Sequence, residues 1–187
     1  SKLIEDINNA DTSILSNITT VRMYKYFTPT LNSGIKYTLS YNNALYNPHS
    51  GHNSSGGGVI SSSGFKVNND SSLNEHFLDD DGAGNLRLYY LSGTTRVYTD
   101  TTYGTVNYTT GEVVLTSAHI TSISNVDGAT STQVRVFATP SSNDVVPVRN
   151  QVLSIDTSNS TITGEVDGIE SGSSQAGTTY TTTSSYS

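Results

Sequence analysis

The feature that most constrains the fold is a strict alternation of apolar and polar residues between residues 35 and 41. The apolar members are Ile35, Tyr37, Leu39 and Tyr41, with a polar residue between each pair. Successive side chains of a strand point to opposite faces, so this segment is predicted to be a strand with one buried and one solvated face. One-sided burial of this kind is typical of antiparallel sheets.

Other short apolar runs, bounded by turn residues, extend this expectation along the chain. Strands are expected at residues 20–27, 59–67, 77–78, 86–91, 97–98, 106–108, 112–115, 134–138 and 161–166, with a short segment around Ile120 and Ile123. Hairpins are expected to join 20–27 to 35–41, 77–78 to 86–91, and 106–108 to 112–115. A loop is expected at residues 46–58, and a turn at Asp127-Gly128.

The composition supports a chain of many strands and turns. It contains 29 Ser, 27 Thr, 17 Asn and 16 Gly, nearly half of 187 residues, while charged residues make up 13%. This low charge is not the signature of a disordered chain. The one helical pattern is at the start, where Leu3, Ile7, Ala10 and Ile14 share a face and predict a helix over residues 2–16 that breaks near Asp11.

The predicted class is therefore mainly β: an N-terminal helix followed by antiparallel hairpins that form one elongated or two small β subdomains. The ranges expected are 1–18 for the helix, 19–100 and 101–170 for the β subdomains, and 171–187 for a flexible or extended C-terminal tail. The tail lacks an aliphatic anchor. The chain does not begin with Met, and we expect it to be a piece of a longer protein.

Charge and residue usage argue against several classes of function. The formal net charge is −7, and the nine Lys and Arg residues are scattered singly, so a nucleic-acid partner is not expected. The chain has no cysteine, and no apolar run is long enough for a membrane helix. We expect no cofactor, no membrane partner and no enzymatic activity, because no motif of a nucleophile, phosphate loop or zinc protease is present.

Two clusters have the residue types of a metal site. Asp79, Asp81 and Gly84 resemble an acidic calcium loop, but Ala83 and Tyr90 occupy the positions where an EF-hand needs oxygen ligands. We expect residues 79–85 to be a solvated hairpin turn, with a calcium site of another type as the alternative. His49 and His52 are expected in a mobile loop, with metal binding as the alternative, since His76 and His119 lie far away in sequence. No metal ligand is therefore predicted.

The segment from Phe137 to Asp156 carries the most specific pattern in the chain. Pro140 is expected to end a strand, because proline has no N–H for the ladder. Pro147 restricts the next extended run to an edge or a bulge. Arg149 and Asn150 lie between apolar runs, and Arg149 is interpreted either as a structural arginine inside its own domain, which is slightly favoured, or as an interface contact. The residues predicted for such an interface are Val145, Val146, Pro147, Val148, Arg149 and Asn150.

This segment, FATPSSNDVVPVRNQVLSID, resembles the C-terminal region of the large baseplate wedge protein of T-even-like contractile-tailed bacteriophages. The segments DTSILSNITTVRM, NSGIKYTLSYNNAL, SSSGF, FLDDDGAGNLRLYY and YGTVNYTTGEVVL resemble the same region in the same order, so the likeness covers about residues 1–170.

The resemblance implies a structural role in the virion. The chain would belong to the tail baseplate, be assembled in the host cytoplasm, and contact a second copy of itself and other wedge proteins. The alternative is a β-sandwich receptor- or glycan-binding module of a fibre or adhesin, which shares the composition.

Overall fold

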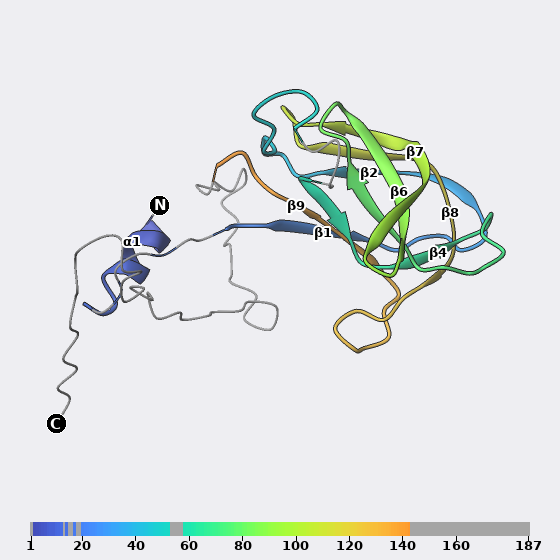
Figure 1. Cartoon of the computed structure of the whole chain (residues 1–187), viewed down its shortest axis with the longest axis horizontal. Coiled ribbons are helices and arrows are strands. Elements are labelled where there is room, and N and C mark those ends of the chain that lie inside the picture. The colour runs from blue at the N-terminus through green and yellow to red at the C-terminus, as the bar shows by residue number, and fades with distance from the viewer. Residues whose placement is uncertain (1, 13, 15–16, 18–19, 53–57, 143–187) are drawn as a thin grey trace, which may run out of the picture. The chain divides into compact units, whose positions relative to one another are not determined.

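A computed structural model describes residues 2–12, 14, 17, 20–52 and 58–142 of the chain (Figure 1). These residues form one short helix and nine strands that pair in antiparallel fashion, so the predicted mainly β class is confirmed. The elements are α1 (Lys2–Asn8), β1 (Met23–Phe27), β2 (Gly34–Ser40), β3 (Ile60–Ser62), β4 (Phe65–Val67), β5 (His76–Asp80), β6 (Asn85–Ser92), β7 (Thr95–Asn107), β8 (Glu112–Ile123) and β9 (Val134–Ala138).

The larger sheet closes into a small barrel. Strands β4, β5, β6 and β7 are neighbours in that order, and β8 pairs with both β4 and β7, which completes the ring. Strand β2 pairs with the remaining part of the β8 edge, from Gly34 opposite His119 to Ser40 opposite Glu112. Closure leaves few unpaired backbone groups, which is one way a β protein limits unwanted association.

A second sheet of three strands has the order β1-β9-β3. Strand β1 pairs with β9 from Met23 opposite Ala138 to Phe27 opposite Val134, and β3 pairs with the other edge of β9. In Figure 1, β1 and β9 lie side by side, with their labels to the left of those of the barrel strands. This sheet therefore adds a second layer to the barrel.

The two sheets share one apolar core. Barrel residues Phe65, Leu78 and Leu115 and sheet residues Ile60 and Val136 are each at most 1% exposed and belong to one continuous cluster. Burial of a side chain of this size contributes about 1.5–3 kcal/mol. The Tyr41 hydroxyl, which comes from the barrel side, donates to the Val136 carbonyl at 2.6 Å and adds a polar link between the layers.

The expected hairpin between residues 20–27 and 35–41 is wrong. Strand β1 pairs with β9 and β2 pairs with β8, so the two segments belong to different sheets. The connecting residues are tied to the barrel, because the Asn32 N–H donates to the Ile120 carbonyl at 2.8 Å and Thr30 donates to the Tyr37 hydroxyl. The chain therefore crosses between the layers at a point where the sequence contains ordinary turn residues.

The single strand expected over residues 59–67 is also wrong. Strand β3 pairs with β9 in the smaller sheet, whereas β4 pairs with β5 and β8 in the barrel. The break falls at Ser63 and Gly64, and each bonds a different sheet: the Ser63 N–H donates to Arg135, and the Gly64 carbonyl accepts from Ser124. Each short strand therefore completes a different layer.

Two of the expected hairpins and one turn are confirmed. Strands β5 and β6 pair directly, and β7 and β8 pair across a turn where Gly111 has a φ of 71°. Asp127 and Gly128 form a tight turn with φ of 52° and 78°. Strands β7 and β8 are longer than expected, and β7 runs without a break past residues 100 and 101, where one expected β subdomain ends and the next begins.

The N-terminal helix is shorter than predicted. Helix α1 ends at Asn8, whereas the apolar spacing predicted residues 2–16. The chain turns at once, with the Ala10 N–H donating to the Ile7 carbonyl at 3.1 Å. Asn8, Asn9 and Asp11 favour turns over helix interiors, which explains the early end. Among the described residues, no helix is long and apolar enough to cross a membrane.

Closure of the barrel depends on Gly104, where β7 meets β8. A Cβ at this position would lie 1.9 Å from the Val114 carbonyl oxygen, which is fixed backbone. We expect Gly104→Ala to lower the free energy of unfolding by about 2–3 kcal/mol, because the strands must separate to admit the methyl group. Urea unfolding measures this change, with Thr105→Ala at the exposed neighbouring position as the control. Equal stability of the two variants would contradict the closure.

Candidate interaction site

Two consecutive carboxylates, Asp79 and Asp80, end strand β5 inside the protein. Their exposed fractions are 1% and 0%. The expectation that residues 79–85 form a solvated turn is wrong at these two positions, since both belong to β5 and the turn begins only at Asp81. Successive residues of a strand face opposite sides, so each carboxylate has its own set of partners.

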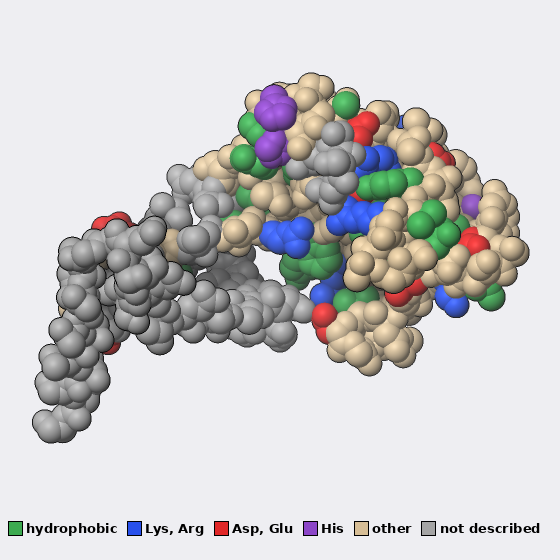
Figure 2. Space-filling model, in the orientation of Figure 1, with side chains coloured by type: hydrophobic (Ala, Val, Ile, Leu, Met, Phe, Trp, Pro, Cys, Tyr) green, Lys and Arg blue, Asp and Glu red, His purple; other side chains and the backbone are tan. Residues whose placement is uncertain are grey.

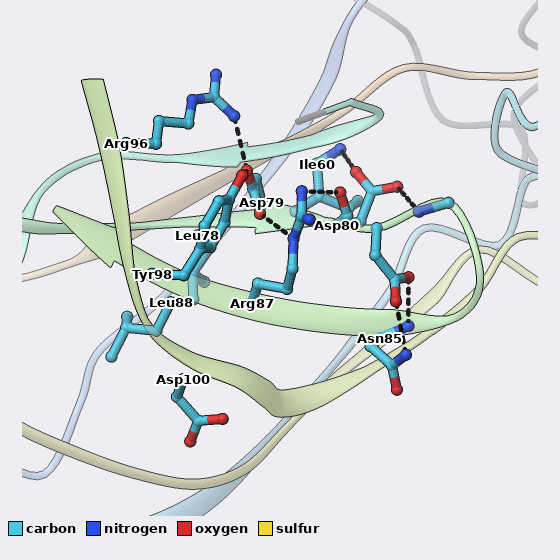
Figure 3. Close-up of polar contacts among 12 residues, drawn as sticks. Ile60, Leu78, Asp79, Asp80, Asn85, Arg87, Leu88, Arg96, Tyr98 and Asp100 are labelled. Atoms are coloured by element: carbon cyan, nitrogen blue, oxygen red, sulfur yellow. Dashed lines mark hydrogen bonds and ion pairs between the residues drawn. The ribbon is translucent and has the colours of Figure 1, made fainter. Parts of the chain in front are cut away.

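Asp80 joins the two sheets. Its Oδ1 atom accepts the backbone N–H groups of Val59 and Ile60, both at 2.8 Å, at the start of β3. Its Oδ2 atom accepts the Tyr108 hydroxyl at 2.7 Å and the Gly82 N–H at 3.3 Å. Burial raises the pKa of Tyr108, and the bond to the Asp80 carboxylate raises it further. Figure 3 shows Asp80 directed towards Ile60.

Asp79 is bound by two guanidinium groups and a phenol. It accepts from Arg87 Nε at 2.9 Å, from an Arg96 terminal nitrogen at 2.6 Å and from the Tyr98 hydroxyl at 2.8 Å (Figure 3). Arg87 also donates to the backbone carbonyl of Asp80 at 2.8 Å. Bonds that involve charged groups are shorter and stronger than neutral ones, so this carboxylate is held firmly.

Aromatic rings complete the group, which we name the Asp79 cluster. The Arg87 guanidinium lies 4.3 Å from the Tyr98 ring centroid, and the Arg96 guanidinium lies 4.7 Å from that of Tyr89. These distances are those of cation–π contacts. The members of the Asp79 cluster are Phe77, Asp79, Arg87, Tyr89, Arg96 and Tyr98.

The Asp79 cluster lies on the outer side of strands β5, β6 and β7. Leu78, Leu86 and Leu88 alternate with its members and enter the core. Burial would lower the pKa of Arg96, but interactions with Tyr89 and Asp79 outweigh it and raise that pKa. The Arg96 side chain is 35% exposed. The Arg96 guanidinium is therefore the charged group of the cluster that a partner can reach most readily.

The outer face of the smaller sheet also presents tyrosines and arginines. Tyr24 and Tyr26 are 44% and 56% exposed. The Arg135 guanidinium lies 5.7 Å from the Tyr24 ring centroid and is paired with Asp127 at 2.9 Å. Figure 2 shows Lys and Arg side chains spaced across the middle of the view, with apolar side chains among them.

A shallow pocket of about 540 Å³ opens between the β7–β8 turn and the β5–β6 turn. Its lining residues are Ala44, Leu45, Asn47, Ala83, Gly84, Val106, Asn107, Tyr108 and Thr109. The Asn47 amide donates to the Gly82 carbonyl at 3.1 Å, whereas its buried Oδ1 atom has no hydrogen-bond partner among the residues that the structure describes. An unpaired acceptor beside a polar pocket is suited to a hydroxyl ligand.

The acidic segment 79–85 and the His49–His52 pair were considered above as possible metal sites. In the described part of the chain, no three His, Asp or Glu side chains lie close enough together to hold a metal ion. The Asp81 carboxylate instead closes its own turn by accepting from Ala83 and Asn85. These bonds outweigh the effect of burial and lower the pKa of Asp81. His49 and His52 contact each other through ring nitrogens 3.1 Å apart.

His76 and His119 lie on different strands, β5 and β8. His76 is fully buried, and its Nδ1 atom lies 3.1 Å from the Asn74 carbonyl. The predicted interface residues Val145, Val146, Pro147, Val148, Arg149 and Asn150 lie outside the described residues, as do the expected strand at 161–166 and the tail from residue 171.

Comparisons of the chain with protein-family models, with curated proteins and with solved structures find no match. The role of these surfaces is therefore argued from their own geometry.

The bonds of Asp80 give a direct stability prediction. Asp80→Asn keeps the shape but replaces a charged acceptor with an amide whose NH₂ must face a donor. We expect a loss of about 3 kcal/mol in the free energy of unfolding. The control is Asp127→Asn, whose ion pair is at the surface and is expected to contribute at most about 1 kcal/mol. Urea unfolding compares the two, and an equal loss in both would contradict the role of Asp80.

The raised pKa values of three tyrosines predict that the protein loses stability at alkaline pH. Burial raises the pKa of Tyr103 to about 12, with the charge of Asp100 adding to it, and the pKa values of Tyr41 and Tyr108 are also raised. An unfolded tyrosine ionises near pH 10, at about its reference pKa. The stabilisation is therefore complete below about pH 10 and is lost as the pH rises towards about 12.

The measurement is the free energy of unfolding in urea across this pH range. Tyr103→Phe should make the fall shallower, because it removes one of the groups that ionises only after unfolding. The matched control is Tyr26→Phe at an exposed position, which should leave the pH profile unchanged. A profile that is flat up to about pH 12 would contradict the assignment.

Proposed function

We propose that the chain is a structural subunit of a phage tail baseplate, and that it corresponds to the C-terminal region of the large wedge protein. Two observations support this proposal. The first is the resemblance of five ordered motifs and the segment from Phe137 to Asp156. The second, which carries the proposal in the structure, is the set of accessible Tyr and Arg side chains on both sheets: Tyr24, Tyr26 and Arg135 on the smaller sheet and Arg96 on the barrel.

These side chains have the properties of a protein contact surface. Tyrosine and arginine are enriched in interfaces, where they contribute most of the binding energy. In the Asp79 cluster, the carboxylate and both guanidinium groups are already hydrogen-bonded. Arg96 is partly exposed and is held over the Tyr89 ring, so ordering it on contact costs little side-chain entropy.

The proposed action is mechanical. The chain would link wedges to one another through contacts with a second copy and with other wedge proteins in the virion, and these contacts would rearrange when the tail contracts. Val145, Val146, Pro147, Val148, Arg149 and Asn150 are proposed for the contact with the second copy. Repetition around a ring strengthens weak pairwise contacts through effective concentration.

The second candidate function is recognition of a glycan by a fibre or adhesin module. The observation that favours it is the pocket with the unpaired Asn47 Oδ1 atom and the exposed Tyr46 side chain nearby in sequence. A sugar hydroxyl could donate to the amide oxygen, and a tyrosine ring offers an apolar face.

Light scattering of the full chain over a wide range of concentrations tests the structural proposal. We expect self-association that Val148→Asp weakens by roughly tenfold or more, because a charge enters the proposed contact. The control is Lys36→Asp, an exposed site on β2, which should leave the association unchanged. A monomer at every concentration, with a glycan bound in a manner that Asn47→Ala abolishes, would contradict the proposal and favour the second function.

A further inference from the structure

The backbone groups of β1 do not all face β9. Across β9, the Thr139 N–H donates to Val59 at 3.0 Å and the Arg135 carbonyl accepts from Ser63 at 2.9 Å. Residues 135, 137 and 139 therefore direct their backbone groups towards β3. Adjacent residues of a strand point in opposite directions, so residues 134, 136 and 138 direct theirs towards β1.

The register then identifies which residues of β1 are paired. The partners of residues 134, 136 and 138 are Phe27, Lys25 and Met23. The Lys25 N–H also faces the Tyr41 hydroxyl, on the side of the core. Tyr24 and Tyr26 therefore direct their N–H and C=O groups away from β9, and among the described residues no strand pairs with this edge.

The other strand edges near β1 are blocked in ways that this edge is not. At β3, the Ser62 hydroxyl accepts from Leu78, and the N–H groups of Val59 and Ile60 are bound by Asp80. The outer strand β2 is interrupted by a bulge between Ile35 and Tyr37, a common way to blunt an edge. Strand β1 pairs with β9 without a shift of register, and its three central residues are exposed.

The positive charges around β1 indicate which kind of strand can pair with its outer edge. Lys25 stands between the two tyrosines, and Arg22 and Arg135 flank them in a chain whose net charge is −7. Within the described residues, neither Lys25 nor Arg22 has an ion-pair partner, and Arg22 donates only to the Ser61 hydroxyl at 3.2 Å. An added strand would place one residue directly opposite Lys25, in the closer type of antiparallel pair.

A second copy of β1 fits this edge poorly. In the symmetric antiparallel pairing that uses the backbones of both Tyr24 and Tyr26, Lys25 would lie directly opposite Lys25 of the second copy. Like charges directly opposite one another destabilise a strand pair. A carboxylate in that place would be stabilised instead, and apolar side chains on either side of it would lie against the two exposed tyrosines.

We propose that the free edge of β1 binds an extended acidic segment of another protein as a fourth strand of the smaller sheet. The segment presents a carboxylate opposite Lys25 and apolar residues opposite Tyr24 and Tyr26. Backbone bonds to the two tyrosines supply the ladder, and side chains supply the selectivity, as in other cases of strand addition. The inference rests on the geometry of β1 alone and does not depend on the baseplate assignment.

The probe is a heptapeptide that alternates Glu with Val, blocked at both ends and labelled for fluorescence anisotropy. It is titrated with the full chain at low ionic strength. We expect saturable binding, a shift of the Tyr24 and Tyr26 amide signals in NMR spectra, and no binding of the peptide that alternates Lys with Val. Lys25→Glu should weaken binding by roughly tenfold or more, whereas Lys36→Glu on β2 should change it less than about twofold.

N-methylated peptides and one further protein variant separate the contribution of backbone hydrogen bonds to binding from that of charge attraction. N-methylation of the valines removes the donors that face β1 and should abolish binding, whereas N-methylation of the glutamates removes donors that face away and should preserve it. Tyr26→Pro removes one free N–H without removing a bond to β9, so it should weaken binding while unfolding remains cooperative.

Three outcomes would overturn the proposal. One is the absence of saturable binding to the native chain, and another is equal weakening by Lys25→Glu and Lys36→Glu. The third is a dimer that pairs through β1, seen as concentration-dependent shifts of the Tyr24 and Tyr26 amides without peptide. None of these outcomes bears on self-association through residues 145–150, so the inference and the proposed function fail separately.

Discussion

The hydrogen bonds of the buried Asp80 carboxylate are the interactions on which the rest of the fold depends. The carboxylate stands at the end of a barrel strand, yet both bonds of its Oδ1 atom go to the backbone of β3 in the smaller sheet. Its other oxygen binds Tyr108, which directly follows β7 in the barrel. One buried charge therefore aligns two layers whose apolar side chains alone would pack with little directional preference.

The neighbouring carboxylate, Asp79, lies on the opposite, outer face of the same strand. By pairing with Arg87 and Arg96, it allows charged side chains to lie flat across β5–β7 and to cover tyrosine rings. The result is an ordered surface of mixed character, apolar in its rings and polar at its edges. Together with the exposed tyrosines of β1, it gives a small, weakly charged chain two surfaces suited to protein partners.

Much of the local structure could be predicted from the sequence. Alternation at residues 35–41 and 134–138 and the glycine at the β7–β8 turn each led to the observed strand or turn, because these signals are local. The pairing of strands could not be predicted in the same way. Residues 20–27 and 35–41 are close in sequence and separated by turn residues, but their core-facing side chains belong to different layers, and no local signal records that choice.

The burial of Asp79 and Asp80 escaped prediction for a similar reason. Aspartates followed by glycines have the composition of an exposed turn, and Asp81 does hold such a turn. The partners of the first two come from β3, β6 and β7, up to 28 residues away. One usable signal was present: Arg87 and Tyr89 alternate with core leucines on β6 and face Arg96 and Tyr98 across the next turn. Residues 145–150, where the interface was predicted, lie outside the described residues.

The measurement that tests this account most directly is native-state hydrogen exchange of individual amides by NMR spectroscopy. The account predicts that the Val59 and Ile60 amides, bound by Asp80, exchange only when the whole domain unfolds. The Tyr24 and Tyr26 amides should exchange much faster than those of Lys25 and Phe27 beside them. Fast exchange at Val59 and Ile60 would contradict the joined layers, and equal protection along all of β1 would contradict the open edge.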